Sequence, residues 1–409
     1  MGKDARAPRG GTTEPGSPGE VFRAFLKLGL TSFGGPVAHI GYFRDEFVQR
    51  RRWFDERAYG DLVALCQFLP GPASSQVGMA IGLSRAGFAG AAAAWTAFTL
   101  PSALLLVLFA FGVAATGDIA EAGWLRGLKI VAVAVVAQAV LGMARSLCPD
   151  RERATFAVVA AAIVLFQPTA FGQVGAIVLG GLAGLLLLGR DGGDGRAYFA
   201  VPVSHGTANL ALAAFFLLLI GLPFLAAASG SMTLALIDGF YRAGSLVFGG
   251  GHVVLPLLQA EVVTPGWVDR DDFVAGYGAA QAVPGPLFTF AAYLGAVMQV
   301  PPTGVAGAVI ALLAIFLPSF LLVVGTLPHW DALRARPQAQ SVLKGVNAAV
   351  VGILLAALYD PVWTTGIHVP ADFALATAAF LLLTMWQTPP WLVVILTSAG
   401  GAALTATGW

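Results

Sequence analysis

The sequence predicts an all-α polytopic membrane protein, built from two homologous repeats of inverted topology with broken and re-entrant helices. Three observations predict this fold class: little charge, recurring apolar runs and an internal repeat. Of the 409 residues, 57% are hydrophobic and 11% are charged, whereas a soluble domain carries about 25% charged residues. Several apolar runs approach the ~20 residues that cross a bilayer. The runs are 89–115, 130–143, 156–166, 174–188, 210–228, 305–324, 346–358, 373–385 and 391–404.

The internal repeat divides the chain into two halves. "FLKLGLTSFGG" at 25–35 matches "FYRAGSLVFGG" at 240–250, and "QFLPGP" at 67–72 matches "QAVPGP" at 281–286. Because further matches follow in the same order, we interpret them as a duplication. The predicted organisation is a disordered tail at 1–20, a first repeat at 21–190, a linker with one extra transmembrane segment at 191–236, and a second repeat at 237–409.

Loop charges indicate that the two repeats have opposite orientations. The loop at 44–57 holds five arginines and its match at 259–272 holds one, whereas the loop at 116–126 is acidic and its match at 327–344 is basic. Lys and Arg concentrate in cytoplasmic loops, so the swap of sign predicts inversion. The same rule predicts that 29–43 enters the membrane and returns, and that the segment around the first Pro-Gly-Pro is re-entrant.

Paired helix breaks form the candidate binding site. Each repeat has a Gly-rich break (31–36 and 246–252) followed by a Pro-Gly-Pro break (70–72 and 284–286). A broken helix in lipid leaves unpaired N–H groups, which are tolerated only beside protein or a water-filled cavity. Since a helix N-terminus favours anions, the breaks predict an anion site near the midplane. For any lone proline the alternative is a structural kink.

The candidate substrate-binding residues lie in or beside these breaks. They are Ser32, Gly34, Gly35, Gln67, Pro70, Gly71, Pro72, Ser74, Ser75, Gln76, Gly250, Gly251, His252, Gln281 and Gly285.

Charged residues recur at matching positions of the two repeats. Four matched cations either offset the charge of a substrate or extend to the membrane interface. Two matched glutamates, Glu46 and Glu261, take up protons, pair with a cation, or lie on a solvated loop edge. The four cations are Lys27, Arg242, Lys129 and Lys344.

Metal, enzyme and nucleic-acid motifs are absent from the sequence. Cys66 and Cys148 have no metal-ligand spacing, and neither His39 nor His252 has a metal-ligand partner at helical spacing. We therefore expect no metal, no cofactor, no nucleic-acid partner and no enzyme activity. The rival classes are a membrane-embedded redox enzyme and a non-transporting assembly or sensor subunit.

Four stretches combine the breaks in a specific pattern: "GLTSFGGPVAHIGYFRDEF" at 29–47, "LCQFLPGPASSQVGMAIG" at 65–82, "FGGGHVVLPLLQAEVV" at 248–263 and "QAVPGPLF" at 281–288. Together they resemble the chromate ion transporters in their long, two-domain form. The resemblance implies a multi-pass protein of the bacterial inner membrane that exports chromate and confers chromate resistance. Sulfate has the same shape and charge, so a sulfate or general oxyanion carrier is the alternative. The expected partners are the transported substrate and the lipid bilayer. The sequence does not decide whether the protein forms a homodimer.

Overall fold

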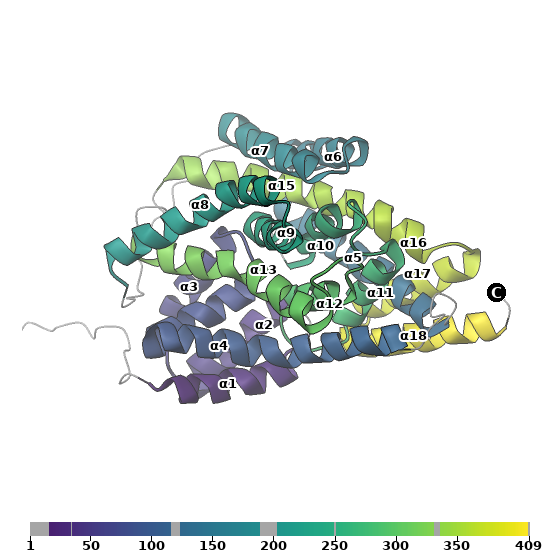
Figure 1. The fold of residues 1–409 in the computed structure, drawn as a ribbon, viewed down its shortest axis with the longest axis horizontal. Helices are drawn as coiled ribbons and strands as arrows, with labels where there is room; N and C mark the ends of the chain where they lie inside the picture. The colour runs from purple at the N-terminus through teal and green to yellow at the C-terminus, as the bar shows by residue number, and fades with distance from the viewer. Residues whose placement is uncertain are drawn as a thin grey trace, which may run out of the picture.

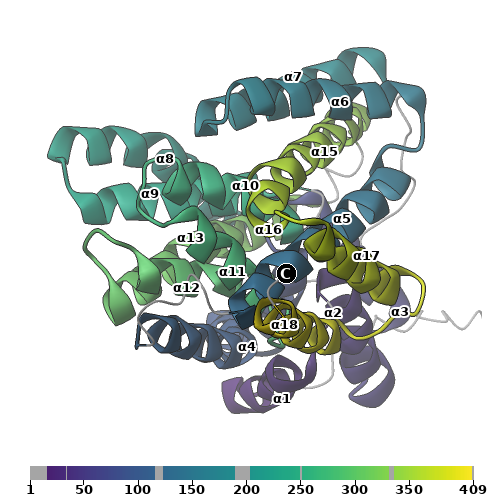
Figure 2. The same cartoon turned by 90° about the vertical axis from the view of Figure 1, so that its right-hand side faces the viewer.

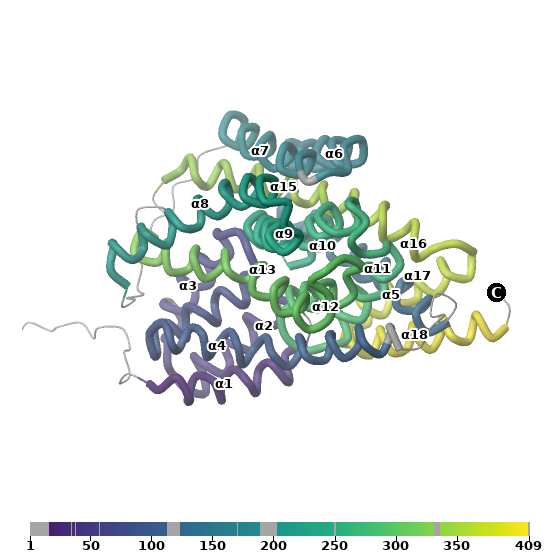
Figure 3. The backbone as a smooth tube through the Cα atoms, in the orientation of Figure 1, coloured from purple at the N-terminus to yellow at the C-terminus, as the bar shows by residue number. Residues whose placement is uncertain are grey.

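The computed structural model describes residues 16–33, 35–115, 123–188, 203–248, 251–330 and 336–407, and every element in these residues is helical (Figures 1 and 3). Within these described residues, five helices are long and apolar enough to cross a membrane, and five shorter apolar helices accompany them. The predicted class, an all-α polytopic membrane protein, is confirmed.

The first repeat begins earlier than the sequence predicts. The helix α1 (Pro18–Thr31) starts inside the tail expected at 1–20, because Ser17 caps it by accepting a hydrogen bond from the Glu20 amide. The rest of that tail, 1–15, lies outside the described residues. The following elements are α2 (Gly35–Arg44), η1 (Asp45–Arg50), α3 (Glu56–Phe68), α4 (Ala73–Ala115), α5 (Gly123–Leu147), α6 (Arg151–Phe166) and α7 (Ala170–Leu187).

The helix α8 (His205–Ser229) lies between the two repeats, and the second repeat is divided into more and shorter elements than the first in the described residues. The second repeat comprises α9 (Met232–Leu246), η3 (Gly251–Val253), α10 (Val254–Leu258), η4 (Gln259–Val263), α11 (Arg270–Ala280), η5 (Leu287–Thr289), α12 (Phe290–Val297), α13 (Gly304–Thr326), η6 (Leu327–His329), α15 (Pro337–Ala357), η7 (Leu358–Trp363), α16 (Thr364–Gly366), α17 (Pro370–Thr384) and α18 (Pro390–Ala406).

The helix α4 consists of two segments that fold back on each other. Gly87 has φ 61°, a left-handed conformation that glycine adopts at little cost. The backbones of Gly82 and Gly90 are in direct contact, although in a continuous helix they would lie about 12 Å apart. A short segment (73–85) therefore follows the first Pro-Gly-Pro, and a long one (88–115) runs back. In the second repeat α12 and α13 form the matching hairpin.

The chain after α1 also returns along its own path. Phe25 of α1 stacks on Phe47 of η1, with ring centroids 4.9 Å apart. Nearby, Lys27 Nζ lies 3.1 Å from Glu46 Oε2. Residues about twenty positions apart are thus side by side, so the chain returns to α1 at η1.

The C-terminal hairpins of the two repeats are exchanged. The helices α6 and α7 of the first repeat pack on α15 of the second, and α17 and α18 pack on α5 of the first (Figure 2). Glycines permit the close approach, since Gly127 of α5 touches the backbone at Thr397 and Gly345 of α15 touches Gly180. The long segment of α4 and α13 run in opposite directions along the molecule (Figure 1). The repeats therefore interlock.

The packing of α1 on α4 predicts a test at Gly29. A Cβ there would lie 2.6 Å from the carbonyl oxygen of Ala97 and 2.9 Å from that of Phe98, and such overpacking costs about 1–3 kcal/mol. We expect Gly29→Ala to lower the melting temperature of the purified protein. Gly142→Ala in α5 is the control, because nothing lies within 4 Å of its Cβ position. Equal melting temperatures for the two variants would contradict the tight packing.

Candidate functional site

The Pro-Gly-Pro breaks are bound crosswise to the first helix of the opposite repeat. The amide of Gly71 donates to the carbonyl of Val247 at 2.7 Å, and the amide of Gly285 donates to the carbonyl of Ser32 at 2.9 Å. Ser32 and Val247 occupy matching positions at the ends of α1 and α9. The two bonds are therefore a reciprocal pair, as in a contact with two-fold symmetry.

The same two glycines face the proline-containing helices α4 and α13 of the opposite repeat. A Cβ at Gly71 would lie 2.8 Å from Ser319 Oγ, and one at Gly285 would lie 2.9 Å from Ser102 Oγ. The two serines match each other, since each follows the proline inside α4 or α13. Both glycines also have positive φ, 118° and 100°. A side chain at either position would therefore strain the turn and push the repeats apart.

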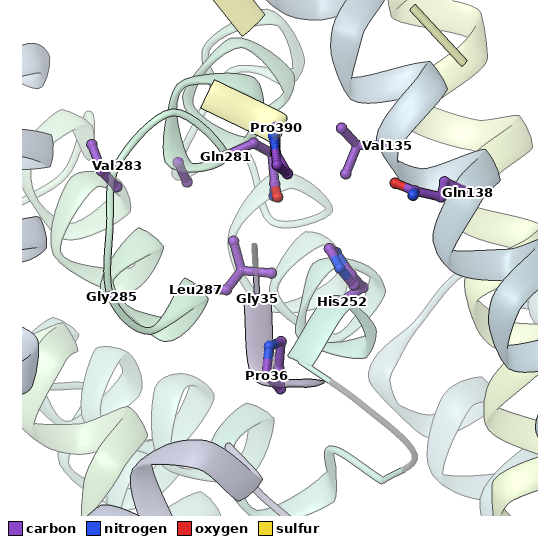
Figure 4. A pocket seen from close by; sticks show the side chains of 11 residues that line it. Gly35, Pro36, Val135, Gln138, His252, Gln281, Val283, Gly285, Leu287 and Pro390 are labelled. Carbon is purple, nitrogen blue, oxygen red and sulfur yellow. The ribbon is translucent and has the colours of Figure 1, made fainter. Parts of the chain in front are cut away.

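A cavity of about 60 Å³ lies where the breaks meet (Figure 4). This volume is several times what one water molecule requires. The two Gly-rich breaks touch beside it, because a Cβ at Gly251 would lie 3.1 Å from Cγ of Pro36. The described lining contains no Asp, Glu, Lys or Arg. It consists of Gly35, Pro36, Val135, Gln138, His252, Ala280, Gln281, Val283, Gly285, Leu287 and Pro390.

Hydrogen-bond donors are available at this uncharged cavity. Gln138 from α5 and His252 from η3 both extend toward its centre (Figure 4). Gln281 Nε2 is buried and has no hydrogen-bond partner among the described residues. The helix α2 begins at the lining residue Gly35, and the first N–H groups of a helix lack internal partners and carry partial positive charge. The lining thus offers donors without a fixed ionic charge.

The polar residues after the first Pro-Gly-Pro are buried outside this lining. Ser74 Oγ lies 3.3 Å from Nδ1 of His39, whose Nε2 lies 3.2 Å from the carbonyl of Ser32. Gln76 donates from Nε2 to a carbonyl of its own break at 2.6 Å. Ser75 Oγ has no partner among the residues that the structure describes. Most of these groups therefore stabilise the break itself.

The remaining candidate residues lie away from the cavity or outside the described residues. Gln67, the match of Gln281, is exposed on α3. Pro70 and Pro72 form the turn around Gly71 and are not part of the described lining. Gly34 and Gly250 lie outside the described residues.

The matched cations of the first helices are bound by the matched glutamates. Lys27 pairs with Glu46 at 3.1 Å, and Arg242 pairs with Glu261 at 2.7 Å and with Asp238 at 2.9 Å. The side chains of Glu46 and Glu261 are only 5% and 10% exposed. The interpretation as a solvated loop edge is therefore wrong, and pairing with a cation is what the structure shows. The return of the chain at η1 and η4 brings each pair together.

The other two cations also lie outside the described lining. Lys129 of α5 pairs with Asp271 in the first turn of α11 at 3.1 Å. Lys344 of α15 has an interaction of its own. The structure therefore places none of the four matched cations at the cavity wall.

Two residues beside the cavity were missed in the sequence. Gln138 is the single polar side chain in the apolar run 130–143, and polar groups inside a membrane segment are functional candidates, so a signal was present. Tyr277 binds His252, with its hydroxyl 2.7 Å from Nδ1. It is one aromatic residue in an apolar helix, and no local pattern distinguishes it.

Known proteins resemble the chain over most of its length. A family model described as chromate transporter matches residues 19–185 and 234–404. The chromate transport protein of Pseudomonas aeruginosa is 28% identical over 97% of this chain and 92% of that protein. A probable chromate transport protein of Synechococcus elongatus is 29% identical over 83% of each chain. The chromate transport protein of Cupriavidus metallidurans is 27% identical over 93% of this chain and 90% of that protein. No solved structure matches significantly.

The buried carboxylate of Glu46 in η1 predicts a stability effect. Burial alone would raise the pKa of Glu46, but hydrogen bonds and charges from Arg51 and Lys27 hold that pKa below its ordinary value. We expect Glu46→Gln to reduce the free energy of unfolding by about 1–3 kcal/mol, because it removes the carboxylate partner of Arg51, which is 29% exposed, and of the half-exposed Lys27. Glu56→Gln is the control, since the Arg44–Glu56 pair is exposed and such pairs contribute about 0–1 kcal/mol.

The pH dependence of this effect has a defined sign. A carboxyl whose folded pKa is lowered contributes its stability above the unfolded pKa and loses it as the pH falls through the folded pKa. The difference between wild type and Glu46→Gln should therefore be full at pH 7 and shrink below about pH 4. Thermal unfolding at several pH values measures it, and a difference that grows in acid would contradict the pairing.

Proposed function

The chain belongs to the chromate transporter family, and we propose that it moves chromate across the membrane through the cavity where the helix breaks meet. This is a family of transporters, not of enzymes. One observation carries the proposal: broken backbones of both repeats surround a cavity lined by donors and free of carboxylates among its described residues. A carboxylate would repel an oxyanion, whereas uncharged N–H donors stabilise it.

The proposed ligands are His252, Gln281 and Gln138, together with the amides at the start of α2. Hydrogen bonds to a charged group are stronger than those between neutral groups, and a helix N-terminus adds partial positive charge. Neutral donors can therefore hold a dianion without a buried cation. They also release it more readily than a buried ion pair, which transport requires. Ser75, whose hydroxyl has no described partner, lies outside the cavity lining and is proposed to act as a donor only if the first break rearranges during transport.

The matched cations are proposed to have two roles away from the cavity. Lys129 lies nine residues before Gln138 on α5, which corresponds to about 13 Å along the helix. There it is proposed to attract an approaching anion without holding it in the cavity, with Asp271 neutralising part of its charge. Lys27 and Arg242 are proposed to fasten the returning helices, because glutamates already neutralise part of their charge.

The proposed direction of transport is export from the bacterial cytoplasm. Export would confer chromate resistance. The inside-negative potential favours outward movement of an anion by ~2.3 kcal/mol per charge per 100 mV. The five arginines of the 44–57 loop support a cytoplasmic position for that loop. The opposite directions of the long segment of α4 and α13 (Figure 1) support two inverted repeats in the inner membrane, with alternating access arising from their relative movement.

The two matched glutamines predict unequal effects on transport. Gln281 lines the cavity and Gln67 is exposed. We expect Gln281→Leu to weaken the apparent affinity for chromate roughly 10- to 100-fold, as for loss of a hydrogen bond to a charged group. Gln67→Leu should leave it near the wild-type value. Chromate uptake into everted membrane vesicles, at matched protein levels, measures both, and equal effects of the two substitutions would refute the cavity as the site.

Competition separates a chromate carrier from a general carrier of tetrahedral oxyanions. Sulfate offers the same charge and shape to the same donors, so only the size of the cavity distinguishes the two. We expect unlabelled chromate to inhibit labelled chromate uptake at lower concentration than sulfate does. Inhibition by both at the same concentration would instead assign a general oxyanion carrier.

A further inference from the structure

A buried tyrosine holds the histidine of the cavity. Tyr277 of α11 is fully buried, and its hydroxyl lies 2.7 Å from Nδ1 of His252. Among the described residues, neither this hydroxyl nor Nε2 of His252 has a further hydrogen-bond partner. His252 also lines the cavity. One ring nitrogen is thus occupied by the tyrosine, and the other is left for the cavity.

His39, the other histidine near the breaks, has no ring nitrogen available for a ligand. Nδ1 of His39 lies 3.3 Å from Ser74 Oγ, and its Nε2 lies 3.2 Å from the carbonyl of Ser32. Both of its ring nitrogens are therefore occupied by the protein. His39 supports the first break, whereas His252 keeps one nitrogen for a ligand.

Hydrogen-bond accounting assigns the donor in the His252–Tyr277 pair. A neutral imidazole has one N–H and one acceptor nitrogen, and a phenol has one hydrogen to donate. If Nδ1 donated to Tyr277, the tyrosine hydrogen would be buried without an acceptor among the described residues, which is unfavourable. The hydroxyl therefore donates to Nδ1, and the ring hydrogen resides on Nε2. The hydrogen bond of one ring nitrogen thus determines the state of the other.

Comparison of the repeats supports a joint role for the two residues. The positions that match His252 and Tyr277 in the first repeat are Val37 and Val63. The second repeat has both polar side chains and the first has neither. The two polar side chains therefore occur together in one repeat and are both replaced by valine in the other, as expected if Tyr277 serves His252.

We propose that Tyr277 is a positioning residue for the transported oxyanion: it fixes the tautomer of His252 so that Nε2–H faces the cavity and donates to an oxygen of the anion. The anion as ligand rests on the proposed function, whereas the tautomer does not. Tyr277 itself does not contact the substrate. It acts by keeping His252 a donor, which an oxyanion requires, rather than an acceptor, which an oxyanion would avoid.

Nitrogen-15 NMR of histidine-labelled protein tests the tautomer without any substrate. The chain has five histidines, and the spectrum of His252→Gln identifies the signals of His252. We expect the Nε2–H form in the wild type and a mixture of tautomers in Tyr277→Phe. Tyr293→Phe is the matched control, because it removes another buried hydroxyl, one that donates to the carbonyl of Asp272. An Nδ1–H form in the wild type, or an unchanged spectrum in Tyr277→Phe, overturns the proposal.

Transport kinetics in proteoliposomes test the consequence. Tyr277→Phe should raise KM for chromate roughly five- to tenfold, as for one lost hydrogen bond, with little change in the maximal rate. In a His252→Gln background the same change should have no further effect, because the amide donor does not depend on Tyr277. Additive effects of the two substitutions would overturn the coupling. If the wild-type protein moves no chromate, the proposed function fails, and the NMR result still decides the tautomer.

Discussion

The structure depends on one constraint: the single amide in each Pro-Gly-Pro break must find a partner. Proline has no N–H, and an unpaired backbone group away from water is costly. In both repeats the partner is a carbonyl of the opposite repeat, Val247 for Gly71 and Ser32 for Gly285. The breaks are therefore stable only while the repeats are joined. The same two bonds bring the Gly-rich breaks together and so create the cavity between them.

The two repeats have similar backbone breaks but differ in the side chains beside those breaks. The first repeat uses His39 and Ser74 to support its break, and the matching positions in the second repeat are Val254 and Phe288. The second repeat instead supplies the histidine that lines the cavity. Equivalent backbones thus produce one cavity with an unequal wall, to which the first repeat contributes Gln138 and the start of α2 and the second contributes His252 and Gln281.

The sequence predicted what local pattern and self-comparison can reveal. The apolar runs predicted the fold class, and the repeat located each break to within a few residues. It could not decide whether Glu46 was solvated, because that depends on the return of η1 to Lys27, nineteen positions away in the chain. Nor could it show that Pro390 and Gln138 share a cavity. Residues so far apart leave no local signal, and matching the repeats does not tell which helix packs on which.

The exchange of the C-terminal hairpins has a consequence for biosynthesis. A chain is made from its N-terminus, and its parts fold as they emerge. The helix α5 is therefore inserted well before α17 and α18, its packing partners, and α6 and α7 precede α15. Lipid must cover these surfaces until the second repeat is complete. In a chain that ended after the first repeat, these helix surfaces would have no protein packed against them. Such a chain would need a second polypeptide to supply the missing helices.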